Sequence, residues 1–423
     1  MGGRTRLLRD PLEIKVEESA RTVNKEVPAM SNGSNQGMTI FAVGDVVINR
    51  DEPESLFALV SPILKKGDIV TGQLEGAITD KASYKDSAGW GPHWAPPKNV
   101  KGLTAGGFNV ISWASNNCLD FGPDAFLDTI DWLRKAGIRV IGAGRNIEEA
   151  RTPAILEVNG TRVGMLAYNS ICFKGYAARE DAPGCAPMRA WTAYHQTEPE
   201  QPGTPCEVVT WPYADDLEAL LNDVRKLKSQ VDVVVISIHW GVHHVPKTIA
   251  TYQPQIAHAA IDAGADVIFG AHPHILKGIE VYKGKVIFYS LNMFAFDWPK
   301  RKPRYGPMDD SALRYNFTRD SEYPNFPFCR EAQKMIVAKC VVSDRKIQRV
   351  SFLPAYINKQ SQPEILTTDN ERFNEVVEYM KEITEHQKLN AKFDIEGDEA
   401  VISSSGPVRR LWLPSIAIPI VDR

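Results

Sequence analysis

The sequence predicts an α/β protein with buried, largely parallel strands. Short apolar runs alternate with helical patterns along the chain, and 43% of its 423 residues are hydrophobic. Apolar runs of this kind are typical of strands covered on both faces, and their alternation with helices favours a parallel sheet. A third observation concerns the ends of these strands, where polar residues such as Asp45, Glu75 and His239 recur.

The first half of the predicted fold begins with MTIFAVGD (38–45), a buried strand that ends in Gly-Asp. A helix is predicted near 53–66. A second helix is predicted to start at Pro123, because proline suits the first helical turn, and to run to about Ala136. Further strands are predicted at 68–76, 108–115, 138–144 and 161–170.

The second half contains VDVVVISIHWG (231–241), the most strand-like segment of the chain. The predicted strands that follow it are 265–274 and 284–292, and the predicted helices are 213–229 and 252–263. The C-terminal third adds a hairpin-like pair of strands at 334–342 and 346–353 and a polar helix near 369–388.

The chain divides into four predicted parts. Residues 1–37 are polar and charged and indicate a disordered leader, and 38–297 form the core, interrupted by an insertion at 172–212. Residues 298–332 are polar, aromatic and rich in proline, and we interpret them as an insertion or lid loop, because long loops in compact domains are usually functional lids or disordered. Residues 333–423 are expected to complete the same domain and to end in a tail.

Composition excludes several classes of partner. The net charge of -3 gives no electrostatic footprint for nucleic acid, and no apolar run reaches the about 18 residues of a transmembrane helix. The N-terminus lacks the hydrophobic segment of a signal peptide, so a cytoplasmic location is expected. The six cysteines show no CxxC spacing and are interpreted as reduced thiols. A small-molecule substrate is expected, and the protein can be either a monomer or a homo-oligomer.

The candidate site consists of polar residues at the ends of predicted strands. Ligand sites in open α/β sheets lie at the carboxyl ends of strands. An acidic residue after a strand is more often a helix cap or solvated, and a single buried histidine is more often hydrogen-bonded in the core. Together they favour a metal site. The residues are Asp45, Glu75, Asn116, Asn117, His239, His272 and His274.

The sequence Gly-Ala-His-Pro-His (270–274) is the sharpest of these signals. Alternate residues of an extended strand point to opposite sides, so the turn at Pro273 must re-aim one of the two imidazoles if both are to reach the same site.

Five segments resemble one family: VGDVVINR, GQLEGAIT, SNNCLDFG, VVVISIHWG and DAGADVIFGAHPHILKGIEVYKGKVIFYSL. They resemble the CapA (PGA_cap) family, the poly-gamma-glutamate capsule synthesis proteins, which belongs with the calcineurin-like metallophosphoesterases. The match runs from about residue 38 to 297. The resemblance implies a four-layer α/β-β/α sandwich of the metallophosphoesterase type, with two metal ions between strand ends.

The resemblance also implies a ligand set. Asp45 and His274 would bind one ion, Asn116, His239 and His272 the other, and Glu75 would lie between them. Mixed oxygen and imidazole ligands suit manganese, iron or zinc. Two divalent ions about 3.5–4 Å apart can generate a bridging hydroxide and hold an in-line displacement.

The chain departs from the family where catalytic residues are expected. Counting back from Asp120 places Asn117 where the family has a histidine that protonates the leaving group, and an amide cannot transfer a proton at neutral pH. His243 stands where the family commonly has glutamate. The candidate catalytic residues are therefore Asn117, Asp120, His243 and His93, although each loop histidine can equally be a surface residue.

These observations favour a dinuclear-metal hydrolase that uses a metal-bridging hydroxide on a small, anionic substrate with a phosphoester, amide or ester bond. Two alternatives stay open: a non-catalytic accessory protein of capsule or poly-gamma-glutamate synthesis, and a metal-binding pseudoenzyme. In each case at least one of the insertions 172–212 and 298–332 is expected to cover the metals, with His243 or an arginine facing the substrate.

Overall fold

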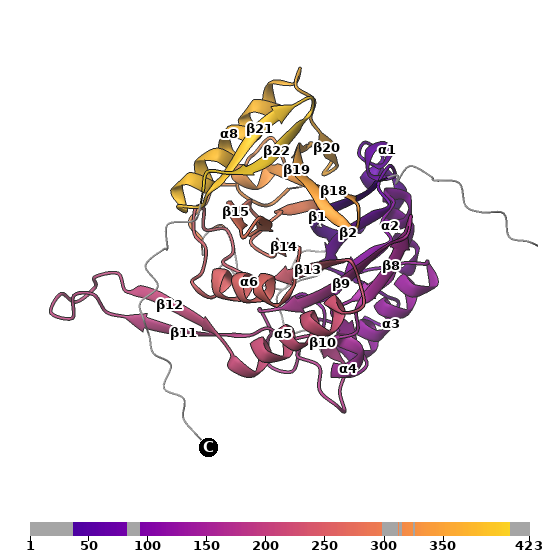
Figure 1. Cartoon of the computed structure of the whole chain (residues 1–423), viewed down its shortest axis with the longest axis horizontal. Coiled ribbons are helices and arrows are strands. Elements are labelled where there is room, and N and C mark those ends of the chain that lie inside the picture. The colour runs from indigo at the N-terminus through magenta and orange to yellow at the C-terminus, as the bar shows by residue number, and fades with distance from the viewer. Residues whose placement is uncertain (1–36, 83–93, 298–311, 313–314, 325, 407–423) are drawn as a thin grey trace, which may run out of the picture. The chain divides into compact units, whose positions relative to one another are not determined.

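Two mixed β-sheets, of ten and six strands, form the centre of the structure (Figure 1). The computed structural model describes residues 37–82, 94–297, 312, 315–324 and 326–406, which all belong to one structural unit, Asn35–Arg423. The predicted leader, except Gly37, lies outside the described residues, as do His93 and most of the first half of the insertion 298–332.

The ten-stranded sheet joins the N-terminal strands to the C-terminal third of the chain. Its order is β21 (Ala391–Glu396), β22 (Glu399–Ser404), β19 (Lys346–Ile357), β18 (Lys334–Ser343), β1 (Met38–Val47), β2 (Ile69–Leu74), β5 (Val110–Ser112) and β6 (Arg139–Ile141), with β17 (Met293–Phe296) beside β1 and β20 (Pro363–Ile365) beside β19. Strands β1, β2, β5 and β6 are parallel, as predicted, whereas β18 and β19 are antiparallel.

The six-stranded sheet is parallel at its centre and has an antiparallel strand at each edge. Its order is β15 (Ile279–Tyr282), β16 (Lys285–Phe288), β14 (Val267–Ala271), β13 (Val233–His239), β9 (Thr161–Asn169) and β8 (Ala154–Val158). Alternate residues of β9 and β13 face two different hydrophobic clusters. One cluster contains residues of the first sheet, and the other contains the buried faces of α5 and α6. Burial on both faces explains the continuous apolar runs in the sequence.

The helices lie around the sheets (Figure 1). The described helices are α1 (Ser61–Leu64), α2 (Val100–Gly106), α3 (Gly122–Lys135), α4 (Ile147–Ala150), α5 (Ala214–Lys228), α6 (Tyr252–Ala263) and α8 (Glu371–His386), with 3-10 turns η1 (Pro53–Phe57), η2 (Pro97–Asn99) and η4 (Arg330–Gln333). The short pairs are β3 (Ala77–Ile78) with β4 (Trp94–Ala95), β7 (Ala143–Gly144) with β10 (Gly184–Cys185), and β11 (Ala190–His195) with β12 (Glu207–Pro212). None of the described helices is long and apolar enough to cross a bilayer.

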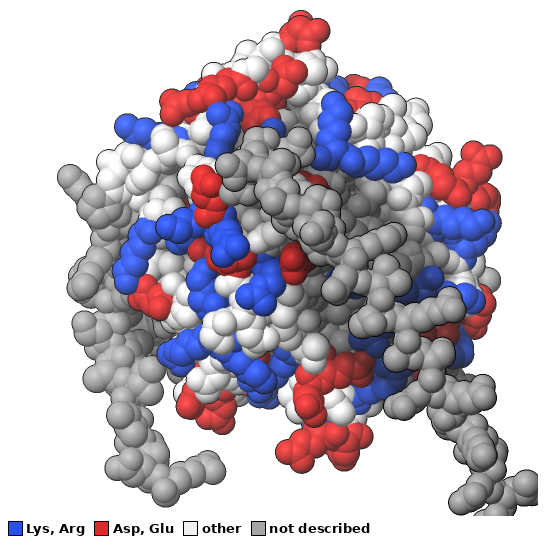
Figure 2. Space-filling model, turned by 45° about the vertical axis from the view of Figure 1, so that its right-hand side comes forward, with Lys and Arg blue, Asp and Glu red and all other residues white. Residues whose placement is uncertain are grey.

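One prediction of local structure was wrong. The helix expected near 53–66 is two short pieces, η1 and α1, because Pro62 cannot donate a helical hydrogen bond and begins a new turn. The insertion 172–212 contains β10 and the hairpin of β11 and β12, which extends to one side in Figure 1. On the face in Figure 2, basic and acidic side chains are interspersed.

Candidate metal centre

The six predicted ligands come from the ends of five strands in two different sheets. Asp45 is near the end of β1, Glu75 directly follows β2, and Asn116 follows β5. His239 is the last residue of β13, and His272 and His274 follow β14. Because β1, β2 and β5 are parallel neighbours, and β13 and β14 also are, each sheet brings its own ligands to one edge.

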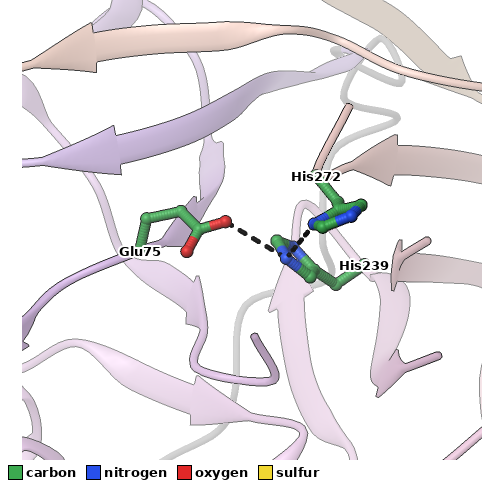
Figure 3. Close-up of side chains that lie close together, drawn as sticks. All are labelled: Glu75, His239 and His272. Atoms are coloured by element: carbon green, nitrogen blue, oxygen red, sulfur yellow. Dashed lines mark hydrogen bonds and ion pairs between the residues drawn. The ribbon is translucent and has the colours of Figure 1, made fainter. Parts of the chain in front are cut away.

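His239 lies at the centre of the group. Its Nε2 atom is 2.7 Å from Asn116 Oδ1 and 3.1 Å from His272 Nδ1. The same atom is 3.1 Å from Glu75 Oε1, and Figure 3 shows the two imidazoles and the carboxylate turned toward one another. The contact with Glu75 lacks hydrogen-bond geometry, since neither carboxylate oxygen of Glu75 has a hydrogen-bond partner among the described residues. Four side chains from the ends of four strands therefore direct polar atoms at one small volume.

Asp45 connects the two sheets. Its Oδ2 atom accepts a hydrogen bond from the backbone N–H of His272 at 2.9 Å, and its Oδ1 atom is 3.7 Å from His239 Nδ1. The preceding Gly44 permits this position: a Cβ atom there would lie 1.7 Å from the carbonyl oxygen of Asn292. The same close approach forms the hydrogen bond from Asp45 N to Asn292 O, at 2.9 Å.

The two histidines around Pro273 both leave the extended conformation. His272 has a φ of +97° and His274 a φ of +54°. Non-glycine residues seldom adopt such angles, and when they do, the surrounding structure has to hold them there. The turn carries His274 Nε2 to within 3.8 Å of Glu75 Oε1, while His272 Nδ1 faces His239. This geometry re-aims the imidazoles, as the spacing of the two histidines requires.

The unpaired polar atoms of the site fit a bound metal. Buried polar groups normally have hydrogen-bond partners, so a cluster without them needs a reason. The buried atoms without such a partner among the described residues include Asp45 Oδ1, both carboxylate oxygens of Glu75, His239 Nδ1 and both ring nitrogens of His274. Ligand atoms within 4.8 Å of one another form two groups of three: Glu75 with His239 and His272, and Asp45 with Glu75 and His274. The two groups share Glu75.

The electrostatics of the site favour the metal-binding protonation states of Glu75 and His272, whereas Asp45 would have to lose its proton to bind a metal. Burial, together with the charge of Glu75, raises the pKa of Asp45 well above its usual value. Burial also acts to raise the pKa of Glu75, but the imidazoles of His239 and His274 outweigh it and lower that pKa to about 2. Burial and the neighbouring imidazoles lower the pKa of His272, which keeps this ring neutral and its lone pair available. A neutral imidazole and an ionised carboxylate are the forms that bind metals.

The predicted catalytic residues have different surroundings. The Asn117 side chain accepts a hydrogen bond from the Asn116 amide, so it lies directly beside a predicted ligand. The Cys118 thiol is buried and interacts with Cys185. Asp120 accepts a hydrogen bond from the Tyr176 hydroxyl at 2.8 Å. Burial is the main reason that the pKa of Asp120 rises to about 8. His93 lies outside the described residues.

His243 stacks directly on a predicted ligand. Its ring centroid is 3.7 Å from that of His272 and 4.7 Å from that of His274. Its Nε2 atom is buried and has no hydrogen-bond partner within the described part of the chain. Burial, followed by the nearby imidazoles, lowers the pKa of His243 well below its usual value. The next residue, His244, is also buried and faces His274 at 5.3 Å.

Aromatic residues of the insertion 298–332 line the same edge, and the sequence reasoning did not single them out. The Tyr315 ring lies 5.2 Å from His244 and 6.2 Å from His243, and the Phe328 ring lies 5.1 Å from His274. The aromatic composition of the insertion was the available signal. Arg301, Arg304 and Arg314, the arginines considered for substrate contact, lie outside the described residues.

A buried lysine next to the site was also missed. Lys277 donates a hydrogen bond to the carbonyl of Val245, just after the two loop histidines, and its side chain is fully buried. Burial lowers the pKa of Lys277 to about 7. The apolar residues around Lys277 in the sequence gave no sign of this, because lysines are rarely buried.

Comparison with known proteins places the chain in a family. The family model for the bacterial capsule synthesis protein PGA_cap matches residues 39–298. The PGA biosynthesis protein CapA of Bacillus subtilis (strain 168) is 29% identical over 304 residues, which cover 70% of this chain and 72% of that protein. The capsule biosynthesis protein CapA of Bacillus anthracis is 30% identical over 311 residues, which cover 70% of this chain and 67% of that protein.

A probable polyglutamine synthesis accessory protein of Mycobacterium tuberculosis (strain H37Rv) is 35% identical over 197 residues, 46% of either chain. The PGA_cap match spans β1 to β17 and so includes all six predicted ligands. The chain belongs to the PGA_cap family of bacterial capsule synthesis proteins.

Proposed function

We propose that this protein is a hydrolase that depends on two divalent metal ions and acts on a small, anionic substrate. The observation that carries the proposal is the pair of buried ligand groups that share Glu75. We also propose that the two sheets, with α5 and α6 over the outer face of the second, form the four-layer sandwich of the metallophosphoesterases. A cytoplasmic location stays a prediction.

The proposed ligands divide between the two ions. Asp45 and His274 would bind the first ion, and Asn116, His239 and His272 would bind the second. Glu75 would bind both ions. Nitrogen and oxygen ligands without a thiolate suit manganese, iron or zinc. When bound, two such ions lower the pKa of water and neutralise charge on an anionic substrate.

The chain itself supplies the surroundings of the substrate. His243 presents a buried ring nitrogen beside His272, where it can form a hydrogen bond with a substrate oxygen or nitrogen. Tyr315 and Phe328 form an aromatic wall on the side of His244 and His274, which limits access of water to this edge. Asn117 orients Asn116 through a hydrogen bond but cannot supply a proton. These residues would bind the substrate and position the ligands. The proton for the leaving group has to come from another group, such as Asp120.

The names of the relatives bear on the substrate. Two of them are named for biosynthesis of PGA or capsule, and we propose that the substrate of this chain is likewise a carboxylate-rich molecule with a glutamyl amide bond. A phosphoester substrate is the rival, because the predicted ligands serve either reaction.

A second candidate function is that of a metal-binding accessory protein without turnover. Asn117 favours it, because the position expected to hold an acid holds an amide. The relative from Mycobacterium tuberculosis is itself named an accessory protein. Metal binding without hydrolysis of any tested substrate would support this candidate.

The test combines metal content with turnover. We expect elemental analysis of the purified protein to find close to two transition-metal ions per chain, and Glu75→Ala and His272→Ala each to lower this content sharply. His195→Ala is the matched control, since His195 is an exposed histidine on the β11 hairpin. Full metal retention in both site variants would reject the ligand assignment.

Turnover is then measured on the metal-loaded protein with two chromogenic compounds, γ-glutamyl-p-nitroanilide and p-nitrophenyl phosphate. Preference for the anilide supports the glutamyl amide, and preference for the phosphate supports the phosphoester. Failure of both with the metals in place would argue for the accessory protein.

A further inference from the structure

Three thiols that are not among the predicted ligands lie close together. Cys172 lies in the turn after β9, Cys185 lies in β10, and Cys118 follows Asn117. The Sγ atoms of Cys172 and Cys185 are 3.7 Å apart, and the buried Cys118 thiol interacts electrostatically with both. No local sequence pattern predicts the cluster, because Cys172 and Cys185 are 13 positions apart and Cys118 and Cys185 are 67 positions apart.

Asn169 fixes both members of the close pair. Its amide Nδ2 donates to Cys185 Sγ at 3.4 Å, and its Oδ1 accepts from the backbone of Ile171 at 2.8 Å, one residue before Cys172. The Cys172 thiol in turn donates to the backbone carbonyl of Asn169 at 3.2 Å. The two sulfur atoms are therefore held next to each other by hydrogen bonds on both sides.

The pair is coupled to the metal centre through two contacts. The backbone N–H of Ser170, two residues before Cys172, donates to the carbonyl of the predicted ligand His239 at 2.8 Å. Tyr176, between the two cysteines, donates to Asp120 in the loop that also carries Asn116. A covalent link between Cys172 and Cys185 would close a loop around Tyr176.

We propose that Cys172 and Cys185 are a redox-active dithiol, which a peroxide converts to an intramolecular disulfide. Cys172 is the less buried of the two and meets the oxidant. Its sulfur attacks one peroxide oxygen, the O–O bond breaks, and Cys172 becomes a sulfenic acid while the other oxygen leaves as water or an alcohol. The Cys185 sulfur then attacks the sulfenic sulfur, the S–S bond forms, and the S–O bond breaks to release water. Two thiols thus give two electrons and two protons to one peroxide.

The surroundings of Cys185 suit this second step. In the reduced form the Cys185 thiol donates to the carbonyl of Tyr176 at 3.3 Å, and the Asn169 amide donates to the Cys185 sulfur, a contact that favours the attacking thiolate form. The sulfur atoms have to approach from 3.7 Å to the about 2.05 Å of a disulfide bond, a shift that side-chain rotation can supply. Cys118 is a poorer partner, because its backbone is hydrogen-bonded into the Ser115 turn of the ligand loop.

The experiment treats the reduced, full-length protein with limiting hydrogen peroxide, labels the remaining thiols with a maleimide under denaturing conditions, and maps tryptic peptides without reduction. Labelled thiols should fall from six to four per chain. Tryptic cleavage after Lys174 and Arg179 places the two cysteines on different peptides. The disulfide therefore appears as one pair of linked peptides, which separates when dithiothreitol reduces the bond. The wild-type map alone decides the pairing, whether or not the variants fold.

Variants then exclude the other thiols. Cys172→Ser and Cys185→Ser should each abolish the linked pair, whereas Cys118→Ser and the matched control Cys340→Ser, a buried thiol in β18, should keep it. A link between Cys118 and Cys185 would overturn the pairing. Unmodified thiols at both positions, with only the exposed Cys206 oxidised, would overturn the redox activity, and so would a sulfinic acid at Cys172 without any disulfide.

Discussion

Replacement of Asp45 by asparagine should raise the stability of the metal-free protein and lower its affinity for metal. Asp45 is completely buried, and its Oδ1 atom has no hydrogen-bond partner among the described residues. An asparagine keeps the acceptor for the backbone N–H of His272, now 2.9 Å from Oδ2, and can turn its amide N–H toward His239 Nδ1, now 3.7 Å from Oδ1. The substitution therefore removes a buried charge without removing the link between the sheets.

The size of the effect follows from burial. An unsatisfied buried polar group costs about 1–3 kcal/mol, and more if it is charged. We therefore expect Asp45→Asn to stabilise the metal-free protein by about 2 kcal/mol at pH 7.5, a rise in Tm of a few degrees for a chain of this size. With metal bound, the order should reverse, because the wild-type protein gains binding free energy that the variant loses.

The dependence on pH has a defined sign. The pKa of Asp45 is raised in the folded state, so its ionisation destabilises the fold above the unfolded pKa. This cost shrinks as the pH falls below the folded pKa and is gone below the unfolded pKa. The advantage of Asp45→Asn should therefore shrink as the pH is lowered. Asp266 is the control: its ion pairs with Lys228 and Lys285 outweigh burial and lower its pKa, so Asp266→Asn should destabilise the protein at pH 7.5.

The assay is calorimetric unfolding of the protein after treatment with a chelator, at pH 5 and pH 7.5, with and without added Mn²⁺. A metal-free variant that is no more stable than the wild type at pH 7.5 would refute the reasoning about the buried charge. Equal stabilisation of variant and wild type by Mn²⁺ would refute the assignment of Asp45 as a ligand.

Three further outcomes are expected. Gly44→Ala should destabilise the protein by about 3 kcal/mol or more in chemical denaturation, because the new Cβ would lie 1.7 Å from Asn292 O; a loss below about 1 kcal/mol would contradict the close approach. Lys277→Met should raise Tm at pH 7, and this gain should diminish toward pH 10. The folded-state pKa of about 7 means that the charged lysine destabilises the fold, so the wild-type protein becomes more stable as the pH rises and the lysine loses its proton. Equal gains in Tm at both pH values would contradict a buried charge. Tyr315→Ala should raise KM for the preferred chromogenic substrate while metal content stays constant, and an unchanged KM would show that the aromatic wall does not contact substrate.

The sequence by itself determined the type of fold and the identity of the candidate ligands. Strands buried on both faces need continuous apolar runs, and the carboxyl ends of parallel strands meet at one edge, so the polar residues that end those runs mark the site. For the same reason Asp45, Glu75, Asn116, Asn117, His239, His272 and His274 were candidates, and the resemblance to the CapA family implied which six of them are ligands. The split of 53–66 at Pro62 was also readable in principle, since proline interrupts a helix.

The tertiary structure alone decided which of these residues meet, because contacts between distant segments leave no local pattern. The antiparallel addition of β18 and β19 to the N-terminal strands depends on pairing across nearly the whole chain. The hydrogen bond from His272 to Asp45 joins residues 227 apart, and the left-handed turn at His272 and His274 is held by such contacts rather than by its own sequence. The aromatic wall, the buried Lys277 and the pairing of Cys172 with Cys185 belong to the same class: each rests on how loops fold back over strand ends, which periodicity and composition do not encode.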